Sequence, residues 1–317
     1  MNGFYTVVKN QNSFILNNTS MKKKVLYILI GFITLLLGGE IYLRKSWGFC
    51  STVLVQSDFD FEYIAQPNQK RYRFKKHILY NEYSQRSEPV DSSAFIILGL
   101  GDSVINGGAL TDQDSLATTH LSKSLSELLK RKVQVLNISA GSWGPDNCEA
   151  YLKRYGTFNA KGAFLICSSH DAHDNINHQQ VVDVRPSFPS HQYRLAYWEL
   201  IDRYLLPRLF KQEEPSEITK DGRVFNPGFQ ALSERFRRAH IPFFIWLHPD
   251  RVEFENGEYN SEGKEIINFC LRDSIPLIQG LQYMDKKDYR DNIHANELGQ
   301  NKISGCLKGH LYSILIK

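Results

Sequence analysis

Ser103 is the residue whose setting in the sequence points most directly to chemistry. The apolar run from Ala94 to Leu100 ends abruptly in Gly101-Asp102-Ser103, and a short apolar run that stops at a glycine predicts a buried strand followed by a tight turn. Open α/β sheets place their ligands at such turns, where a strand ends and a helix begins. The N–H groups and dipole of that helix favour a negative oxygen. We therefore expect Ser103 to be a nucleophile.

A serine hydroxyl needs a general base, and the base needs a group that orients it. Among the ten histidines, His294 stands out, because Asp291 precedes it by three residues in one turn and can hold the imidazole in one tautomer. Asp-x-x-His alone is a common pattern, and its pairing with Gly-Asp-Ser at the other end of the domain carries the prediction. Asp102 is expected to shape its turn through side-chain hydrogen bonds.

A parallel sheet would bring these distant residues to one edge, and residues 91–317 alternate between apolar strands and amphipathic helices. The predicted strands are Phe95–Leu100, Val133–Ile138, Ala163–Cys167, Pro242–Leu247 and Pro276–Ile278. The predicted helices are Leu116–Leu129, Ala150–Tyr155, Phe229–Arg238, Gly263–Leu271 and Leu298–Ile316. This alternation predicts a three-layer α/β/α sandwich around a doubly wound, flavodoxin-like parallel sheet of about five strands.

One connection is too long for a minimal fold of this kind. Residues 174–228 lie between the third and fourth predicted strands and include a helical pattern over Tyr193–Phe210. A connection of this length is either a lid or substrate wall, or an insertion that only packs on the domain. The pattern leaves both interpretations open.

Over residues 94–317 the chain resembles the SGNH hydrolases, also called GDSL esterases. Gly101-Asp102-Ser103 matches their first block and Asp291-x-x-His294 their last, while Val135–Gly144 resembles the second block. Phe164–Asp171 lies where the third block, Gly-x-Asn-Asp, is expected. The resemblance implies a serine enzyme that hydrolyses or transfers acyl esters through an acyl-serine, with Ser103, His294 and Asp291 as its triad and with neither a metal nor an organic cofactor.

The resemblance also implies an oxyanion hole, although the middle two blocks depart from the family pattern. The backbone N–H of Ser103 and that of Gly141 or Ser142, depending on register, are expected to donate to it. His170 stands in place of the family's asparagine, and its imidazole N–H can also donate. Asn175 is a second candidate donor.

Two further residues are candidates for contact with substrate. Trp143 is either a stacking platform for a sugar or a half-buried loop aromatic. His248 follows the fourth strand and either lines the pocket or belongs to a solvated turn. The group formed by Asp171, His173, Asp174 and His178 has no firm coordination pattern, so an active-site loop is expected there rather than a metal site.

Near its beginning the chain carries a candidate membrane segment. Residues 25–43 are apolar except for Thr34 and Glu40, and Lys22-Lys23-Lys24 precede them. Nineteen helical residues span about 28 Å, close to the hydrocarbon thickness of a bilayer. We expect a cytoplasmic tail over 1–24, a single-pass anchor over 25–43, and the catalytic domain outside the cytoplasm, in the periplasm or at the cell surface. A cleaved signal peptide that starts at Met21 is the alternative.

Residues 44–90 are expected to be an extension that links the anchor to the domain. The run Lys70–Lys76 alternates aromatic and basic residues and is either a solvated β-hairpin, which we favour, or a patch for lipid headgroups or nucleic acid. With 42% hydrophobic residues and a net charge of +4, the chain has an ordinary globular composition, and no nucleic-acid partner is expected. Its five cysteines show no Cys-x-x-Cys spacing, which argues against a metal site. The sequence allows one disulfide but does not indicate which cysteines would form it.

These observations predict a serine esterase or acyltransferase that acts on acyl esters, foremost O-acetyl esters of envelope or extracellular glycans. A lipase or lysophospholipase at the membrane is the nearest enzymatic alternative. A catalytically silent glycan-binding or scaffold protein is the alternative from another class, because the second and third blocks are altered.

Overall fold

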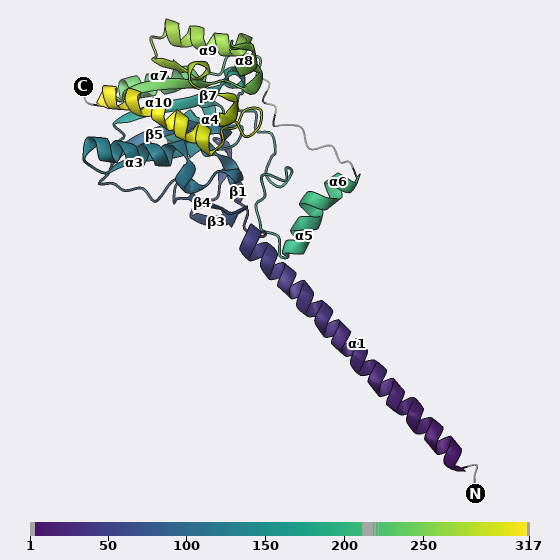
Figure 1. Ribbon diagram of the computed structural model, residues 1–317. Helices are drawn as coiled ribbons and strands as arrows, with labels where there is room; N and C mark the ends of the chain where they lie inside the picture. Colours follow the sequence, from purple (N-terminus) through teal and green to yellow (C-terminus); the bar gives the residue numbers. More distant parts are fainter. Residues whose placement is uncertain (1–3, 211–217, 219, 221, 316–317) are drawn as a thin grey trace.

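The computed structural model describes residues 4–210, 218, 220 and 222–315, and side chains from Met21 onward (Figure 1). Its centre is a five-stranded sheet in which every neighbouring pair of strands is parallel. In spatial order the strands are β6 (Val133–Ser139), β5 (Phe95–Gly101), β7 (Gly162–Ser168), β8 (Phe243–His248) and β9 (Leu277–Gln279). The chain enters the sheet at β5, adds β6 on one side, and then continues on the other side with β7, β8 and β9. This single reversal confirms the predicted flavodoxin-like, doubly wound sheet.

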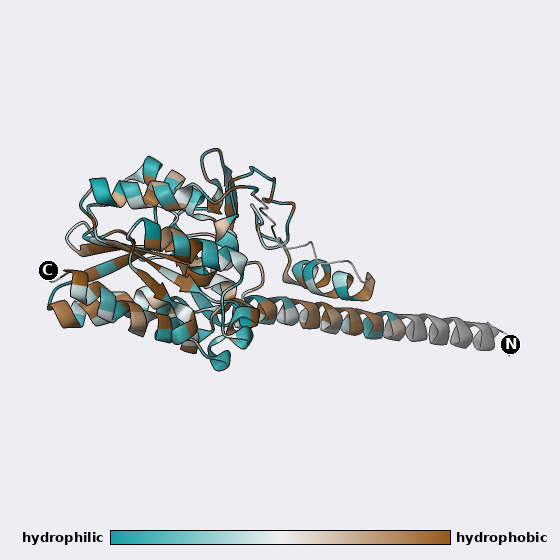
Figure 2. Cartoon of the chain, turned by 90° about the horizontal axis from the view of Figure 1, so that it is seen from above, coloured by the Kyte–Doolittle hydropathy of each residue, from teal (hydrophilic) through white to brown (hydrophobic). Residues whose placement is uncertain are grey.

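Helices cover both faces of the sheet because successive strand residues point to opposite sides. On one face, Ile97, Phe164 and Trp246 pack under α3 (Ala117–Leu129) and α10 (Glu297–Leu315). On the other face, Leu98, Leu165 and Leu247 pack under three helices: α4 (Pro145–Tyr155), α7 (Gly228–Arg238) and α9 (Ser261–Arg272). Figure 2 shows the apolar strands between these two layers of helices. The predicted three-layer α/β/α sandwich is therefore confirmed.

The predicted strands are all present, and each lies within one residue of its predicted bounds. The largest difference among the predicted helices is at α4, which begins at Pro145 rather than at residue 150. Proline suits the first helical position because its missing N–H is not needed there. The backbone N–H of Gly144 donates to the side chain of Asn147, 2.8 Å away, and this contact helps to fix the start of the helix.

The amino-terminal helix is much longer than the predicted anchor. Helix α1 runs from Phe4 to Trp47 without interruption, and no proline occurs within it. By length and composition, Met21–Trp47 could cross a membrane, and the helix extends away from the sheet domain (Figure 1). The boundaries of the predicted tail and anchor remain predictions.

The extension after α1 folds into two antiparallel hairpins. The first pairs β1 (Val55–Asp58) with β2 (Glu62–Ala65), and the second pairs β3 (Gln69–Arg73) with β4 (Lys76–Tyr80). The basic run Lys70–Lys76 is thus a β-hairpin, and its Arg73 is buried rather than displayed on the surface. All five cysteine thiols are free.

The long connection after β7 contains the helical segment expected there. Helix α5 (Ala196–Leu200) continues through a π-helical turn (Ile201–Leu205) into α6 (Leu206–Phe210). The remaining helices are short: α2 (Ser103–Asn106) follows β5, and α8 (Arg251–Asn256) follows β8. These two short helices stand at the edge of the sheet where the parallel strands end.

Candidate active site

Ser103 follows the carboxyl end of β5, an inner strand of the sheet, and is the first residue of α2. The turn before it requires glycine, because Gly101 has φ of 152° and a Cβ there would lie 2.4 Å from the carbonyl oxygen of Ile166. Asp102 caps α2, accepting the N–H of Val104 at 2.8 Å, as expected from the sequence. The strand end therefore presents the Ser103 hydroxyl at the sheet edge, half-buried.

The structure brings the three predicted triad residues together. The Nε2 atom of His294 lies 2.9 Å from Oγ of Ser103, and its Nδ1 atom lies 2.9 Å from both carboxylate oxygens of Asp291. When Nδ1 carries the proton and donates it to Asp291, Nε2 is free to accept the Ser103 hydroxyl. This is the geometry in which an imidazole can take a proton from a nucleophilic serine.

Asp291 is held in its charged form. Partial burial raises the pKa of its carboxyl, but the backbone N–H groups of His294 and Ile293 and the adjacent imidazole outweigh burial, so the net pKa is lowered. The N–H of His294 donates to Asp291 at 2.8 Å and that of Ile293 at 3.1 Å. The carboxylate can therefore orient the imidazole throughout the neutral pH range.

His248 supports this turn from below and does not line a pocket. Its side chain is fully buried, and Nε2 donates to the carbonyl oxygen of Ile293 at 2.8 Å. Burial lowers the pKa of His248 to about 4, so the ring is neutral at pH 7. The prediction that His248 contacts substrate or belongs to a solvated turn is therefore wrong, because His248 ends a buried strand beneath the His294 turn.

The loop after β6 carries Gly141 and Ser142, the predicted backbone donors of the oxyanion hole. Ser142 has φ of 57°, a left-handed conformation that is uncommon for serine. The hydroxyl of Tyr63, from β2, donates to the carbonyl oxygen of Gly141 at 2.8 Å and lies 3.4 Å from that of Ser142. A side chain of the extension thus holds in place the loop that carries the two predicted donors.

Trp143 is not available for stacking on a sugar. Its side chain is only 1% exposed, and its Nε1–H donates to the backbone carbonyl oxygen of Tyr63 at 2.9 Å. The ring packs edge-on against Phe61. Both predicted roles for Trp143, sugar platform and half-buried loop aromatic, are wrong, since residue type alone does not reveal that β2 covers it.

His170 lies beside the nucleophile turn, with its side chain 42% exposed. Its Nε2 atom is 3.8 Å from a carboxylate oxygen of Asp102 and 3.7 Å from one of Asp174. The other proposed donor, Asn175, is committed elsewhere: its amide donates to the carbonyl oxygen of Val224 at 3.0 Å and so ties two parts of the insertion together. His170 therefore lies beside the Ser103 turn, whereas the amide of Asn175 is used within the insertion.

The carboxyl groups of Asp102 and Asp171, close to His170, are buried. Burial raises the pKa of both Asp102 and Asp171, and the charge of Asp102 raises that of Asp171 further. Potential metal ligands of three residues, Asp102, His170 and Asp171, lie within 4.8 Å of one another. These residues could therefore bind a cation. Two of them already serve the fold: Asp102 caps α2, and Asp171 accepts the N–H of Ser168 at 2.7 Å.

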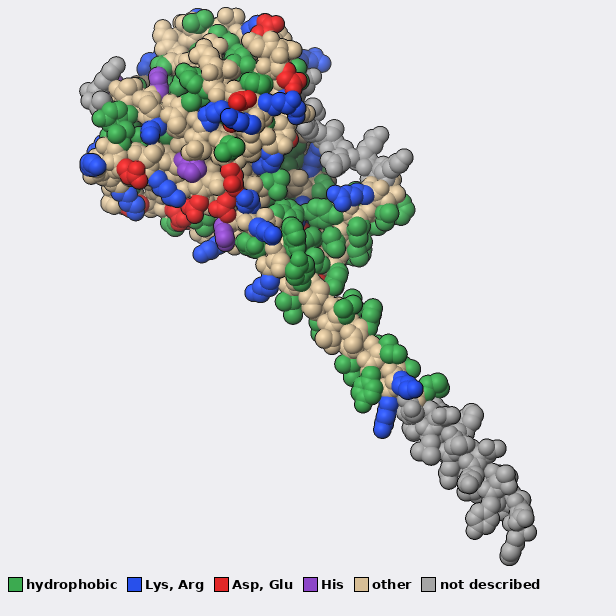
Figure 3. Space-filling model, viewed as in Figure 1, with side chains coloured by type: hydrophobic (Ala, Val, Ile, Leu, Met, Phe, Trp, Pro, Cys, Tyr) green, Lys and Arg blue, Asp and Glu red, His purple; other side chains and the backbone are tan. Residues whose placement is uncertain are grey.

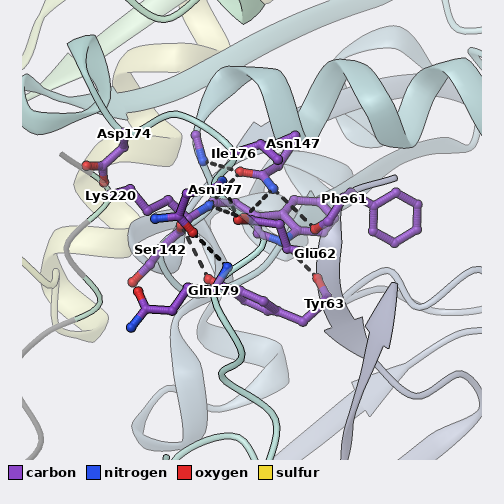
Figure 4. A network of polar contacts seen from close by, with 12 residues as sticks. Phe61, Glu62, Tyr63, Ser142, Asn147, Asp174, Ile176, Asn177, Gln179 and Lys220 are labelled. Carbon is purple, nitrogen blue, oxygen red and sulfur yellow. Dashed lines mark hydrogen bonds and ion pairs between the residues drawn. The ribbon is translucent and has the colours of Figure 1, made fainter. Parts of the chain in front are cut away.

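A buried polar network joins the extension to the insertion close to Ser142 (Figure 4). The ammonium of Lys220 pairs with Glu62 and donates to Asn147 at 2.9 Å, and both ionic side chains are buried. The other Glu62 oxygen accepts the N–H groups of Asn177 and His178, each at 2.9 Å. Sequence analysis missed this network and Tyr63, because nothing in the sequence pairs residue 62 with residue 220.

Comparisons with known proteins find likeness in solved structures alone. No family model matches the chain, and no curated protein matches it. A G-D-S-L family protein from Desulfitobacterium hafniense DCB-2 is 10% identical and covers 68% of this chain and 98% of its own, with a TM-score of 0.39. The esterase EstA from Pseudoalteromonas sp. is 14% identical, covering 70% and 100% of the two chains with a TM-score of 0.40. A carbohydrate acetylesterase family member from Sinorhizobium meliloti is 11% identical, covering 70% and 99% with a TM-score of 0.37.

Proposed function

We propose that this chain is an SGNH-type serine hydrolase that cleaves acyl esters through an acyl-serine intermediate. One observation carries the proposal: Oγ of Ser103, the imidazole of His294 and the carboxylate of Asp291 form a continuous hydrogen-bonded chain with 2.9 Å links. A nucleophile, a base and an orienting group in this order are what acyl transfer from an ester requires.

The reaction follows from these contacts. His294 accepts the hydroxyl proton while Oγ of Ser103 bonds to the ester carbonyl carbon, and the carbonyl oxygen becomes an oxyanion. The N–H of Ser103, the backbone at Gly141 and Ser142, and His170 would stabilise that charge. The imidazolium then returns the proton to the departing alkoxide, which leaves an acyl-serine. Water or a sugar hydroxyl, deprotonated by the same imidazole, attacks this ester and frees Ser103.

We further propose that the acyl group is short, foremost an O-acetyl group on a glycan outside the cytoplasm. The position of Phe188, in the insertion, is the observation that favours a short acyl group. Its Cζ atom would lie 3.6 Å from a Cβ built at Gly141. The ring also packs edge-on against Tyr63, with centroids 5.1 Å apart. An aromatic wall this close to the oxyanion loop leaves little room for a long chain. Anchorage by α1, with Lys22–Lys24 on the cytoplasmic side, would place the domain outside.

Covalent labelling tests the proposed function most directly. The purified full chain in detergent, treated with a fluorophosphonate probe, is expected to be labelled at Ser103 and to release acetate from an aryl acetate. Both results should persist in the presence of a chelator, since the proposed steps use only side-chain and backbone groups. Absence of labelling, under conditions in which a known serine esterase reacts, would contradict the proposal and favour a binding protein.

Phe188→Ala is expected to change which acyl chain is accepted. Removing the ring should raise the ratio of kcat/KM for an aryl octanoate over an aryl acetate by about tenfold, in the range by which apolar pockets discriminate chain length. Phe59→Ala is the control, because Phe59 is exposed and belongs to the neighbouring hairpin. An unchanged ratio would show that the insertion does not form the acyl wall.

Tyr63→Phe is expected to slow acyl transfer without weakening substrate binding. Loss of the hydroxyl frees the Gly141 carbonyl and loosens the oxyanion loop, so kcat should fall by about 10- to 100-fold with little change in KM, as for weakened oxyanion stabilisation. Tyr151→Phe is the matched control, since that buried hydroxyl donates to the carbonyl of Tyr83, 2.8 Å away. Equal kinetics for Tyr63→Phe and the wild type would contradict the role of Tyr63.

Asp174 is expected to make the protein less stable as the pH rises. Burial, followed by the charge of Asp171, raises the pKa of Asp174 to about 7 from 3.8. Between these values the folded chain holds a proton that the unfolded chain has lost, so stability falls as pH rises from about 4 to 7. Asp174→Asn should therefore raise Tm by several degrees at pH 8 and change it little at pH 4. Equal shifts at both pH values would contradict this titration.

A further inference from the structure

The segment Leu195–Phe210, which contains α5 and α6, carries an apolar stripe that no described part of the chain covers. Its members recur every three or four residues, as on one side of a helix. They are Leu195, Trp198, Ile201, Leu205 and Leu209, all exposed, with exposed Phe210 at the end. Trp198 is 54% exposed and Leu209 is 73% exposed. Soluble surfaces seldom hold so continuous an apolar strip, and such strips mark interaction sites.

The other side of this segment is fastened to the extension by buried charge. Glu199 is completely buried and pairs with Arg73 at 2.6 Å and with Arg203 at 3.2 Å. Its second oxygen accepts the backbone N–H of Cys50 at 2.6 Å. Because a buried carboxylate with these partners fixes the rotation of α5 about its axis, the apolar stripe is held facing outward.

The segment also docks on α1 at a defined height. The carboxylate of Glu40 accepts the N–H groups of Ala196 and Tyr197 at 2.7 and 3.2 Å, and so caps the start of α5. The Tyr197 ring lies where a side chain of residue 39 would be, since a Cβ at Gly39 would be 1.7 Å from its hydroxyl oxygen. Glycine is unfavourable inside a helix relative to alanine, and close packing against α5 explains its presence here.

This docking places the stripe at the level where α1 would leave a bilayer. Arg44 donates to the carbonyl oxygen of Arg194, directly before the segment. Arg44 lies twenty residues after Lys24, a rise of about 30 Å along the helix, which matches the hydrocarbon thickness of a bilayer. Figure 1 shows that α5 and α6 leave α1 sideways instead of running along it. In Figure 3, their apolar side chains continue the apolar surface of α1 on the side away from the sheet domain.

We propose that Leu195–Phe210 is an interfacial helix that lies in the surface of the same bilayer that α1 crosses. Trp198 and the leucines would enter the boundary between headgroups and acyl chains, while buried Glu199 holds the opposite side on the protein. The aromatic and basic residues around the junction suit such a boundary; they include Tyr42, Arg44, Lys45, Trp47, Arg194 and Arg208. The inference rests on the proposed anchoring by α1 and is independent of esterase activity.

Quenching of tryptophan emission by brominated lipid tests the proposal in the full chain. The protein is reconstituted into vesicles of phosphatidylcholine, with or without bromine at shallow acyl positions, and the contribution of Trp198 is taken as the difference between wild type and Trp198→Phe. We expect brominated lipid to remove at least half of this contribution. The variant Trp47→Phe/Trp198→Phe is the control, because its remaining tryptophans, Trp143 and Trp246, are buried in the sheet domain and should keep their emission.

The outcomes separate the failures. If the chain floats with vesicles but Trp198 is quenched by aqueous iodide and not by brominated lipid, the stripe faces water and the proposal is overturned. If Trp198 is protected from both quenchers, a second protein or a second copy covers the stripe, which also overturns it. If the chain does not float with vesicles, the anchor proposal itself fails and this inference fails with it. None of these results depends on whether the chain cleaves esters.

Discussion

Ser103→Ala is expected to lower kcat for an aryl acetate by at least about 10⁴-fold, to the level left by binding and oxyanion contacts. Among the described residues, the Ser103 hydroxyl is the only hydrogen-bond partner of Nε2 of His294 that could attack the acyl carbon, and the substitution removes it. Hydrolysis followed at pH 8 in detergent measures the effect. Labelling by the fluorophosphonate probe should disappear in parallel.

Ser93→Ala is the matched control for this prediction. Ser93 is an exposed serine just before β5, whereas Ser103 follows the same strand, so the two hydroxyls lie at opposite edges of the sheet. The control should keep wild-type rates and labelling. If Ser103→Ala retained more than about a tenth of the activity while folded, a nucleophile other than Ser103 would be required and the proposed mechanism would be wrong.

Asp291→Asn is expected to lower kcat by about 10³- to 10⁴-fold with little change in Tm. An amide at this position can donate to Nδ1 of His294, which favours the tautomer whose Nε2 carries the proton and cannot accept one from Ser103. The side chain is partly exposed, so the neutral replacement costs little in folding. Steady-state kinetics with an aryl acetate, together with a thermal unfolding curve, separates the two effects.

Asp273→Asn serves as the control for Asp291→Asn. Asp273 follows helix α9 at the opposite edge of the sheet and pairs with Arg272 at 2.9 Å. Comparable rate losses in the two variants would mean that removal of a carboxylate acts through stability alone. Full activity of Asp291→Asn would show that the imidazole needs no anionic partner here.

The predicted part of the fold is the part that local patterns determine. Apolar runs such as residues 95–100 and 163–167 are short, bounded and buried on both faces, which is typical of parallel strands. Once the strands are parallel, the residues that follow them share one sheet edge. For this reason Ser103 and His294 could be placed together although 191 positions separate them.

The rest depends on contacts that no local pattern encodes. Residue type at Trp143 and position after a strand at His248 leave substrate contact open for both, but packing of β2 and of the His294 turn buries both side chains. Tyr63 was overlooked because its hydroxyl reaches the oxyanion loop from 78 residues away. Residue type indicates what a side chain can do, whereas tertiary packing decides whether it is accessible.

The ion pair between Glu62 and Lys220 has a consequence for where the folding unit begins. Lys220 is buried in the shell around the sheet, and its carboxylate partner comes from the second strand of the chain. A fragment that starts at residue 91 would lose the counterion of Lys220 and the strand β2 that covers Trp143. A shortened form of the protein should therefore retain both hairpins and begin close to the end of α1, so that the strands that follow α1 remain with the domain that they complete.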